Sequence, residues 1–456
     1  MHISSGLVAL FTSFAFAQPV EFEVIRFDTV SVWKKNEFNT IVTRGSLRNN
    51  QPKLTTQQLG NTFKPFNFTL ECSPVVPKAI CSAANASFNR AGDRIAAILK
   101  ITKTINVDAK FYPFCENQGN SCDLGNVLGQ AAAAANFIGL APSPASKALY
   151  PQALVKQVNT QYNLDYNDYD IIAEFNSEFS FWYPSLNQSI TAGQYDFEYV
   201  ICHELTHGLG FDTTWFDWGA LYSEYMSSPF NVFLPDIRVN GADPYSPLTK
   251  VTQWSLPRIY DIYIYDSRTG TNLTTYYNNI SSLYPANQQS FQNFLNNLVN
   301  SPAYSIGRAL LQSVTAGAGT FKFMVKQNGS TVYIPLATPT KYSIGSSVAH
   351  LDYASHYLTP DFLMIPSIDD AVARSLDTVI SSKKGISYGV YGNATVALLA
   401  QLGWPINTIS TPSGNSSTGT TFTPETRNLT TTGYKSNSLR TPVNCILTLL
   451  CIGMFV

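Results

Sequence analysis

The stretch His203-Glu204-Leu205-Thr206-His207 places two of the five histidines of this 456-residue chain four positions apart. Residues with this spacing lie on one face of a helix, about one turn from each other, so both imidazoles can bind one zinc ion. The intervening Glu204 would then lie beside the open position of the metal, where a carboxylate can act as a general base. The stretch therefore predicts a hydrolase with one catalytic zinc ion, and it favours an endopeptidase.

The residues around this stretch predict the helix that carries it. Asp196 is suited to be its N-cap, because a carboxylate there can accept a hydrogen bond from an amide of the first turn. Gly208 and Gly210 are expected to end the helix, since glycine permits the positive φ of a sharp exit.

Hydrophobic periodicity predicts further elements before this helix. Residues 89–99 have the apolar spacing of an amphipathic helix, whereas residues 101–111 and 170–175 have the pattern of strands. A strand-like run also occurs at residues 259–265, in the long segment after the helix.

A catalytic zinc ion needs a third protein ligand besides the two histidines of the motif. The candidates elsewhere in the chain are His350, His356 or a carboxylate such as Glu224.

Three segments together resemble the metzincin clan of zinc peptidases, and specifically its leishmanolysin-like branch. They are His-Glu-Leu-Thr-His-Gly-Leu-Gly-Phe at 203–211, Gly-Ser-Ser-Val-Ala-His-Leu-Asp at 345–352 and Asp-Phe-Leu-Met-Ile-Pro at 361–366. The resemblance covers roughly residues 89–406. It implies an α+β, zincin-like (metzincin) catalytic domain with a mixed sheet, an active-site helix and a large insertion before the third ligand.

The resemblance also implies roles for individual residues. His203, His207 and His350 would bind zinc, Glu204 would be the general base, and Met364 would be the methionine of the turn beneath the metal. Residues 170–176 resemble the edge strand that pairs with extended substrate, and residues 395–404 resemble the C-terminal helix. The insertion, at about 213–349, is longer than is usual in this branch, and His356 remains an alternative ligand.

The two ends of the chain have the composition of targeting segments. Residues 1–17 resemble a secretory signal peptide, and residues 18–70 would be an N-terminal extension or a propeptide. The peptidase domain is expected at 71–407, followed by a Ser/Thr-rich stalk at 408–440. The apolar tail at 441–456 fits a GPI-attachment signal, with a frayed terminus or a weak anchor as the alternative.

Sequons and cysteines also indicate a secreted, extracellular glycoprotein, or a cell-surface protein held by a GPI anchor. Two local disulfides are expected, Cys72–Cys81 and Cys115–Cys122, and Cys202 is expected to be a buried thiol. The nine N-x-S/T sites are Asn67, Asn85, Asn187, Asn272, Asn279, Asn328, Asn393, Asn415 and Asn428.

The charge composition limits the classes of partner. The formal net charge is −1 and only 13% of residues are charged, without a run of Lys or Arg, so no nucleic-acid partner is expected. A peptide or protein substrate is expected, with membrane contact only through the GPI anchor, and the chain is expected to be a monomer.

Two alternative functions are consistent with the same residues. One is a gluzincin-type peptidase that uses Glu224 as the third ligand. The other is a non-catalytic, GPI-anchored surface glycoprotein with a relic zinc site.

Overall fold

The computed structural model describes residues 23–25, 63–115, 126–140, 147–159, 164–221, 230–240, 248–317, 319–327, 329–368 and 373–407. These residues form a mixed α+β structure with several small sheets, as the sequence predicted at this level. None of the described helices is long and apolar enough to cross a membrane.

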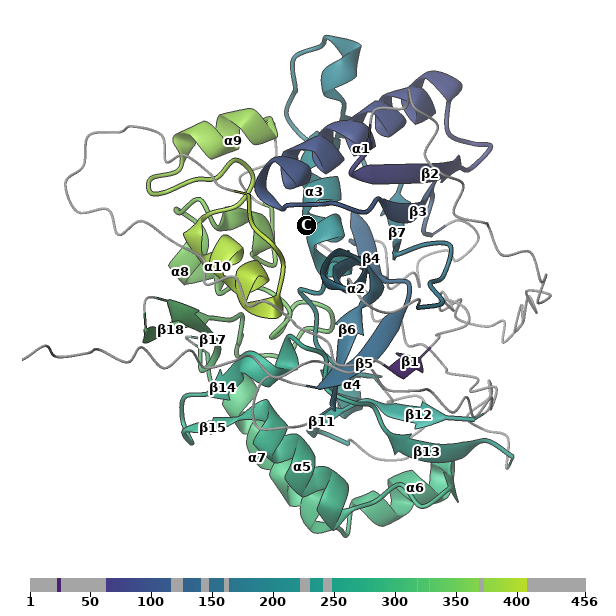
Figure 1. Cartoon of the computed structure of the whole chain (residues 1–456), viewed down its shortest axis with the longest axis vertical. Helices are drawn as coiled ribbons and strands as arrows, with labels where there is room; N and C mark the ends of the chain where they lie inside the picture. Colours follow the sequence, from purple (N-terminus) through teal and green to yellow (C-terminus); the bar gives the residue numbers. More distant parts are fainter. Residues whose placement is uncertain are drawn as a thin grey trace, which may run out of the picture.

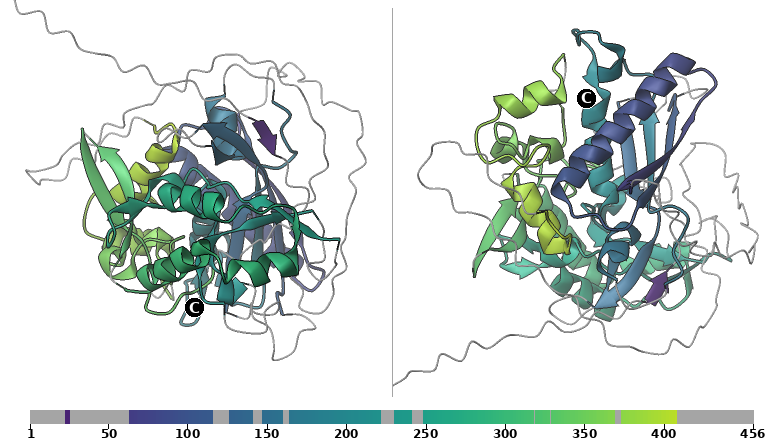
Figure 2. Two further views of the ribbon diagram at one scale, coloured as in Figure 1. Left: turned by 90° about the horizontal axis from the view of Figure 1, so that it is seen from below. Right: turned by 45° about the horizontal axis from the view of Figure 1, so that its top comes forward.

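The main sheet has four strands in the order β2 (Phe66–Cys72), β3 (Ile105–Tyr112), β7 (Ile171–Asn176) and β4 (Gly129–Ala133). The first three strands are parallel, and β4 runs antiparallel to β7. Two helices, α1 (Lys78–Ile98) and α3 (Phe197–Gly208), pack against the sheet and against each other (Figures 1 and 2).

Aromatic rings fill the space between these helices and the sheet. Phe197, near the start of α3, packs against Phe88 of α1 at 5.9 Å, Phe111 of β3 at 5.1 Å and Phe175 of β7 at 5.4 Å between ring centroids. All four side chains are buried. The packing of these rings fixes the position of the start of α3 relative to β3 and β7.

The structure extends or corrects three expectations about these elements. The helix expected over residues 89–99 begins earlier, directly after Pro77, and the disulfide Cys72–Cys81 ties its first turn to β2. The strand β2 crosses the boundary expected between residues 70 and 71. The expectation that residues 170–176 form the edge strand is wrong, because β7 lies between β3 and β4 and the edge beside α3 is β4.

A second, three-stranded sheet lies beside the main one. It consists of β1 (Glu23–Ile25), β5 (Asn136–Leu140) and β6 (Lys147–Pro151), and the short helix α2 (Gln152–Val158) follows β6. Between β7 and α3, the pair β8 (Phe181–Trp182) and β9 (Tyr195–Asp196) flanks the turn η2 (Pro184–Leu186).

The long segment after α3 forms three small antiparallel sheets and a layer of helices, at the bottom of Figure 1. The sheets are β10–β11, β12–β13–β16 and β15–β14–β17–β18. In chain order the elements are β10 (Trp215–Asp217), α4 (Trp218–Leu221), β11 (Phe233–Pro235), β12 (Ile237–Val239), β13 (Lys250–Trp254), η4 (Asp261–Tyr263), β14 (Ile264–Asp266), β15 (Thr271–Asn272), α5 (Leu273–Leu283), β16 (Gln289–Ser290), α6 (Phe291–Leu298), α7 (Pro302–Val314), β17 (Phe321–Gln327) and β18 (Ser330–Pro335). The strand-like run at 259–265 is only partly a strand, because η4 precedes β14.

After β18 the chain returns to α3. It forms α8 (Tyr353–His356), η5 (Phe362–Met364), α9 (Leu376–Ser382) and α10 (Asn393–Leu402). The helix α10 corresponds to the one expected over 395–404 and ends at Gly403, which has φ +113°. Trp404 donates a hydrogen bond from Nε1 to the Leu209 carbonyl at 2.9 Å, which fixes the chain after α10 beneath the end of α3.

Candidate metal centre

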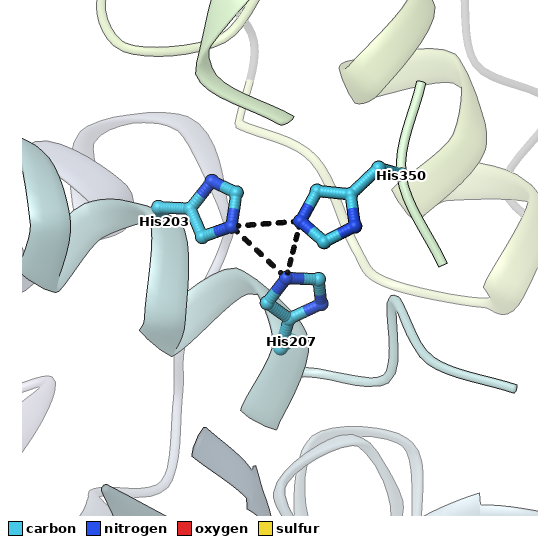
Figure 3. A group of neighbouring side chains, drawn as sticks. All are labelled: His203, His207 and His350. Carbon is cyan, nitrogen blue, oxygen red and sulfur yellow. Dashed lines mark hydrogen bonds between the residues drawn. The ribbon is translucent and has the colours of Figure 1, made fainter. Parts of the chain in front are cut away.

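Three histidines point their Nε2 atoms at one another (Figure 3). His203 and His207 come from α3, and His350 comes from the loop after β18. The Nε2 atom of His203 lies 3.1 Å from that of His207 and 3.1 Å from that of His350, and the third separation is 3.3 Å. The structure therefore brings together residues that are far apart in the sequence.

The opposite nitrogen of each ring contacts a backbone carbonyl. The Nδ1 atom of His203 lies 2.6 Å from the Leu363 oxygen, and that of His207 lies 2.7 Å from the Phe211 oxygen. The Nδ1 atom of His350 lies 3.1 Å from the Ser346 oxygen. A carbonyl only accepts hydrogen bonds, so each Nδ1 carries the proton and each neutral ring presents an Nε2 lone pair to the centre.

Three lone pairs this close repel one another unless a cation lies between them. A tetrahedral zinc ion with Zn–N distances of about 2.0–2.1 Å holds its nitrogen ligands about 3.3 Å apart. The observed separations of 3.1–3.3 Å fit this value. The carbonyl contacts at Nδ1 are also the usual outer partners of histidines that bind zinc.

Burial keeps the three imidazoles neutral. All three side chains are buried. Burial lowers the pKa of His203 to about 4 and holds the pKa of His207 and of His350 well below the usual value. The neutral form is the one that binds a metal ion, so protons compete weakly for these nitrogens near neutral pH.

Glu204 lies on the same helix and is also buried. Its side chain lies against the edge strand, because a Cβ placed on Gly129 of β4 would be 3.2 Å from Glu204 Cγ. Gly208, the last residue of α3, lies directly over Ile171 of β7, where a Cβ would be only 2.5 Å from the isoleucine side chain. Glycine at these two positions allows α3 to approach the sheet closely.

The N-terminus of α3 is fixed by charged groups. Asp196 is the N-cap, as predicted, and its carboxylate accepts a hydrogen bond from the Glu198 amide at 2.9 Å. Glu198 in turn forms ion pairs with Arg90 and Arg94 of α1. The sharp turn of the chain after the C-terminal end of α3 was also predicted correctly, since Gly210 adopts φ +109°.

The loop that presents His350 is held by backbone hydrogen bonds. Ala337 donates from its amide to the His350 carbonyl and accepts at its own carbonyl from the Val348 amide, both at 2.8 Å. Leu351 donates to the Met364 carbonyl at 2.8 Å. Because the Leu363 carbonyl accepts from His203, the turn at η5 contacts both the residue that follows His350 and the ring of His203.

The structure describes two of the three other candidate residues. His356 lies in α8, between Asp352 and Asp361, and is not part of the three-histidine group. Met364 is buried in η5. Glu224 lies outside the described residues.

The structure confirms one of the two expected disulfides and describes six of the nine sequons. Besides Cys72–Cys81, Cys115 is disulfide-bonded, and Cys122 lies outside the described residues. Cys202 is a buried free thiol whose pKa is raised by burial. Asn67, Asn85, Asn187 and Asn279 are exposed and Asn272 and Asn393 are half-buried, whereas Asn328, Asn415 and Asn428 lie outside the described residues.

Sequence reasoning missed the groups that orient the imidazoles. The acceptors are backbone carbonyls of Leu363, Phe211 and Ser346, and every residue has such a carbonyl, so no sequence signal could identify them. The edge strand β4 was also missed.

The fold and this site define an α+β protein with a buried cluster of three metal-competent histidines. The chain belongs to the SPBPB7E8-like family, which it matches over residues 30–438. It is similar to the uncharacterized protein PB7E8.01 of Schizosaccharomyces pombe, with 24% identity over 349 residues that cover 70% of this chain. The chain spans 58% of the length of that relative. No solved structure matches the chain.

Proposed function

We propose that this chain is a secreted, zinc-dependent endopeptidase with a zincin-like catalytic domain of the metzincin type. The observation that carries the proposal is the arrangement of the three histidine rings. Each ring directs its Nε2 lone pair to a common centre, while its Nδ1–H group donates to a backbone carbonyl. Glu204 between two of these ligands adds the group that a hydrolase needs and that a purely structural zinc site does not.

Each residue of the site has a distinct role in this proposal. His203, His207 and His350 hold the metal ion with neutral nitrogens. When bound, zinc at such a site lowers the pKa of water toward neutrality and polarises a carbonyl. Glu204 accepts the proton of the attacking water and later delivers it to the leaving amine.

An extended peptide would be bound by β4 rather than by β7. The strand β4 is the edge of the described sheet that lies beside α3, and Gly129 at its beginning adjoins Glu204. An extended peptide adds to a sheet edge through backbone hydrogen bonds, which bind without requiring a particular side chain. A substrate along β4 would thus pass beside the proposed general base.

Secretion is part of the same proposal. The disulfide Cys72–Cys81 is typical of proteins that fold in an oxidising compartment. The sequons that the structure describes are exposed or half-buried, so glycans could be attached there. The signal peptide, the stalk and the GPI signal lie outside the described residues and remain predictions.

The decisive experiment measures zinc content and peptide cleavage on the secreted protein and on His350→Ala. We expect one zinc ion per chain and chelator-sensitive cleavage, both lost in His350→Ala. His356→Ala is the matched control and should keep both. Zinc and activity that survive in His350→Ala would overturn the ligand set.

Glu204→Ala separates metal binding from catalysis. It should keep zinc and lose cleavage by at least about 100-fold, the usual contribution of a general acid or base. Full activity in this variant would contradict the mechanism. A wild-type protein that binds zinc and cleaves no peptide in a diverse library would favour the non-catalytic surface glycoprotein.

A further inference from the structure

Tyr260, in the turn before η4, contacts Phe211 and Val348, which lie next to two of the three histidines. We propose that Tyr260 is a positioning residue that couples His207 and His350, so that the inserted segment holds the metal centre together. This inference rests on the proposed metal centre and adds a role for a residue outside the motif. Its support comes from contacts on both sides of the tyrosine.

On the first side, Tyr260 packs against the residue that orients His207. Its ring centroid lies 5.1 Å from that of Phe211, at an angle of 36° between the planes. The Phe211 carbonyl accepts the Nδ1 proton of His207. Displacement of Phe211 would therefore rotate the imidazole of His207 away from the other two ligands.

On the second side, the Tyr260 hydroxyl donates a hydrogen bond to the Val348 carbonyl at 2.9 Å. Val348 lies two residues before His350 and has φ +69°. A β-branched residue rarely adopts this left-handed conformation, which persists only where the surrounding structure enforces it. The hydroxyl of Tyr260 is one of the groups that enforce it.

The turn that carries Tyr260 is itself fixed to the exit of α3. The Asp261 carboxylate accepts hydrogen bonds from the hydroxyls of Thr213 at 2.6 Å and Thr214 at 2.7 Å. The Arg258 amide donates to the same carboxylate at 2.8 Å, and the Arg258 side chain forms an ion pair with Asp212. The tyrosine is therefore held against the α3 exit while it reaches the His350 loop.

All the groups in this link are buried. Tyr260, Val348, Phe211 and Asp261 have no exposed surface. Removal of the hydroxyl would leave the Val348 carbonyl without this donor in a site where water is excluded, and the strained turn would lose a restraint. The expected consequence is a less preorganised position for His350 and weaker metal binding.

Tyr260→Phe tests the link, with Tyr284→Phe as its matched control. Tyr284 lies in the same inserted segment and donates its hydroxyl to the Phe294 carbonyl at 2.8 Å, so both variants lose the same kind of hydrogen bond. We expect Tyr260→Phe to raise the zinc dissociation constant by up to about tenfold, the lower end of the range for direct partners of metal ligands, because Tyr260 acts through Val348. Tyr284→Phe should bind zinc like the wild type.

Competition with a chromogenic chelator gives the dissociation constants, and thermal melting of the zinc-free proteins shows whether both variants fold. Equal zinc affinities for the two folded variants would overturn the inference while leaving the proposed function intact. A wild-type protein that binds no zinc would instead remove the proposed function. The two failures are therefore distinguishable.

A second pair of variants keeps the test independent of Tyr260. Thr214→Val removes one hydroxyl donor from Asp261 at nearly constant volume, and Thr214→Ser retains a hydroxyl. We expect weaker zinc binding in Thr214→Val, by a smaller factor than in Tyr260→Phe, and recovery in Thr214→Ser. Equal zinc affinities of Thr214→Val and Thr214→Ser would count against a role of this turn in metal binding.

Discussion

At the scale of single residues, Gly129 leaves the space that the Glu204 side chain occupies. A Cβ at this position would lie 2.9 Å from Phe175 Cδ1 and 3.2 Å from Glu204 Cγ. We expect Gly129→Ala to retain zinc and to lower kcat by about 10- to 100-fold, because a small displacement of a catalytic group has effects of this size. Cleavage rates normalised to bound zinc would measure the loss.

Gly307→Ala is the control for this prediction. A Cβ at Gly307 of α7 would lie 2.9 Å from Leu234 in the inserted segment, so it crowds its neighbours to a similar degree. It should alter stability and leave the rate per bound zinc unchanged. A wild-type kcat in Gly129→Ala would argue against Glu204 as the base.

The residues of the candidate site were partly predictable from the sequence. His203, Glu204 and His207 follow from one helical motif, because their spacing alone places them on neighbouring faces. His350 required the resemblance, since a ligand from a distant loop has no fixed spacing from the helix. Tyr260 was unpredictable, because its role depends on the Val348 carbonyl and the Phe211 ring, which only the tertiary structure brings near it.

Among the secondary-structure elements, α3 and α9 are connected by the carboxylate of Asp196, which caps α3 and accepts a hydrogen bond from the first turn of α9. It accepts from the Glu198 amide of α3 and, at 2.7 Å, from the Leu376 amide of α9. Burial raises the pKa of Asp196 to about 6, and the Glu198 charge adds to this, while the amide donors oppose it. The folded state thus binds a proton at pH values where the unfolded chain has released it.

The pH dependence of stability follows from this raised pKa. Between the ordinary pKa of 3.8 and about 6, the folded state binds more protons than the unfolded state, so the free energy of unfolding falls as the pH rises. The contribution of Asp196 is on the order of 2–3 kcal/mol at about 1.4 kcal/mol per pKa unit. Asp196→Asn cannot titrate and should lack this contribution.

Melting of the wild type and Asp196→Asn between pH 4 and 7 tests the expectation. The difference in unfolding free energy, wild type minus variant, should decrease across this range. Titrating groups that do not interact with Asp196 contribute equally to both proteins and cancel in the difference. Loss of a cap adds only a constant offset, so a pH-independent difference would refute the assignment.

The elements were predictable where their sequences are strongly patterned. The strands β3 and β7 carry alternating or continuous apolar residues, and the sequence pattern predicted both strands. The edge strand β4 has the sequence Gly-Gln-Ala-Ala-Ala, without a β-branched or aromatic residue, so propensity gave no signal for it. Its small residues instead reflect the close packing of α3 on this strand.

At the scale of the whole molecule, the position of β2 limits where the mature chain can begin. This strand is the parallel partner of β3 and carries Cys72 of the disulfide to α1. We expect the N-terminus of the purified protein to lie before Phe66, whether or not an earlier segment is removed. N-terminal sequencing would show this directly, and a mature start beyond Cys72 would contradict it.

The strand pairings of the long segment between α3 and His350 could not be predicted from the sequence. Its sheets join short strands that are distant in the chain, such as β14 with β17, and their pairing depends on tertiary contacts more than on local pattern. The segment lies against the α3 exit and the His350 loop through Tyr260 and Asp261. The segment between α3 and His350 is therefore part of the support of the candidate site.

Metal removal should lower the stability of the fold, because the three histidines join α3 to the loop after β18. A ligand that binds only the folded state stabilises it by about 4 kcal/mol at a thousandfold excess over its dissociation constant. Chelation should therefore lower the Tm of the wild type by roughly 5–10 °C. His350→Ala should melt at a lower temperature that the chelator does not change, whereas His356→Ala should respond like the wild type. Equal chelator shifts in His350→Ala and the wild type would mean that the metal binds elsewhere. If the chelator lowered the Tm of all three proteins equally, the stabilising ion would lie at a site other than the three-histidine centre.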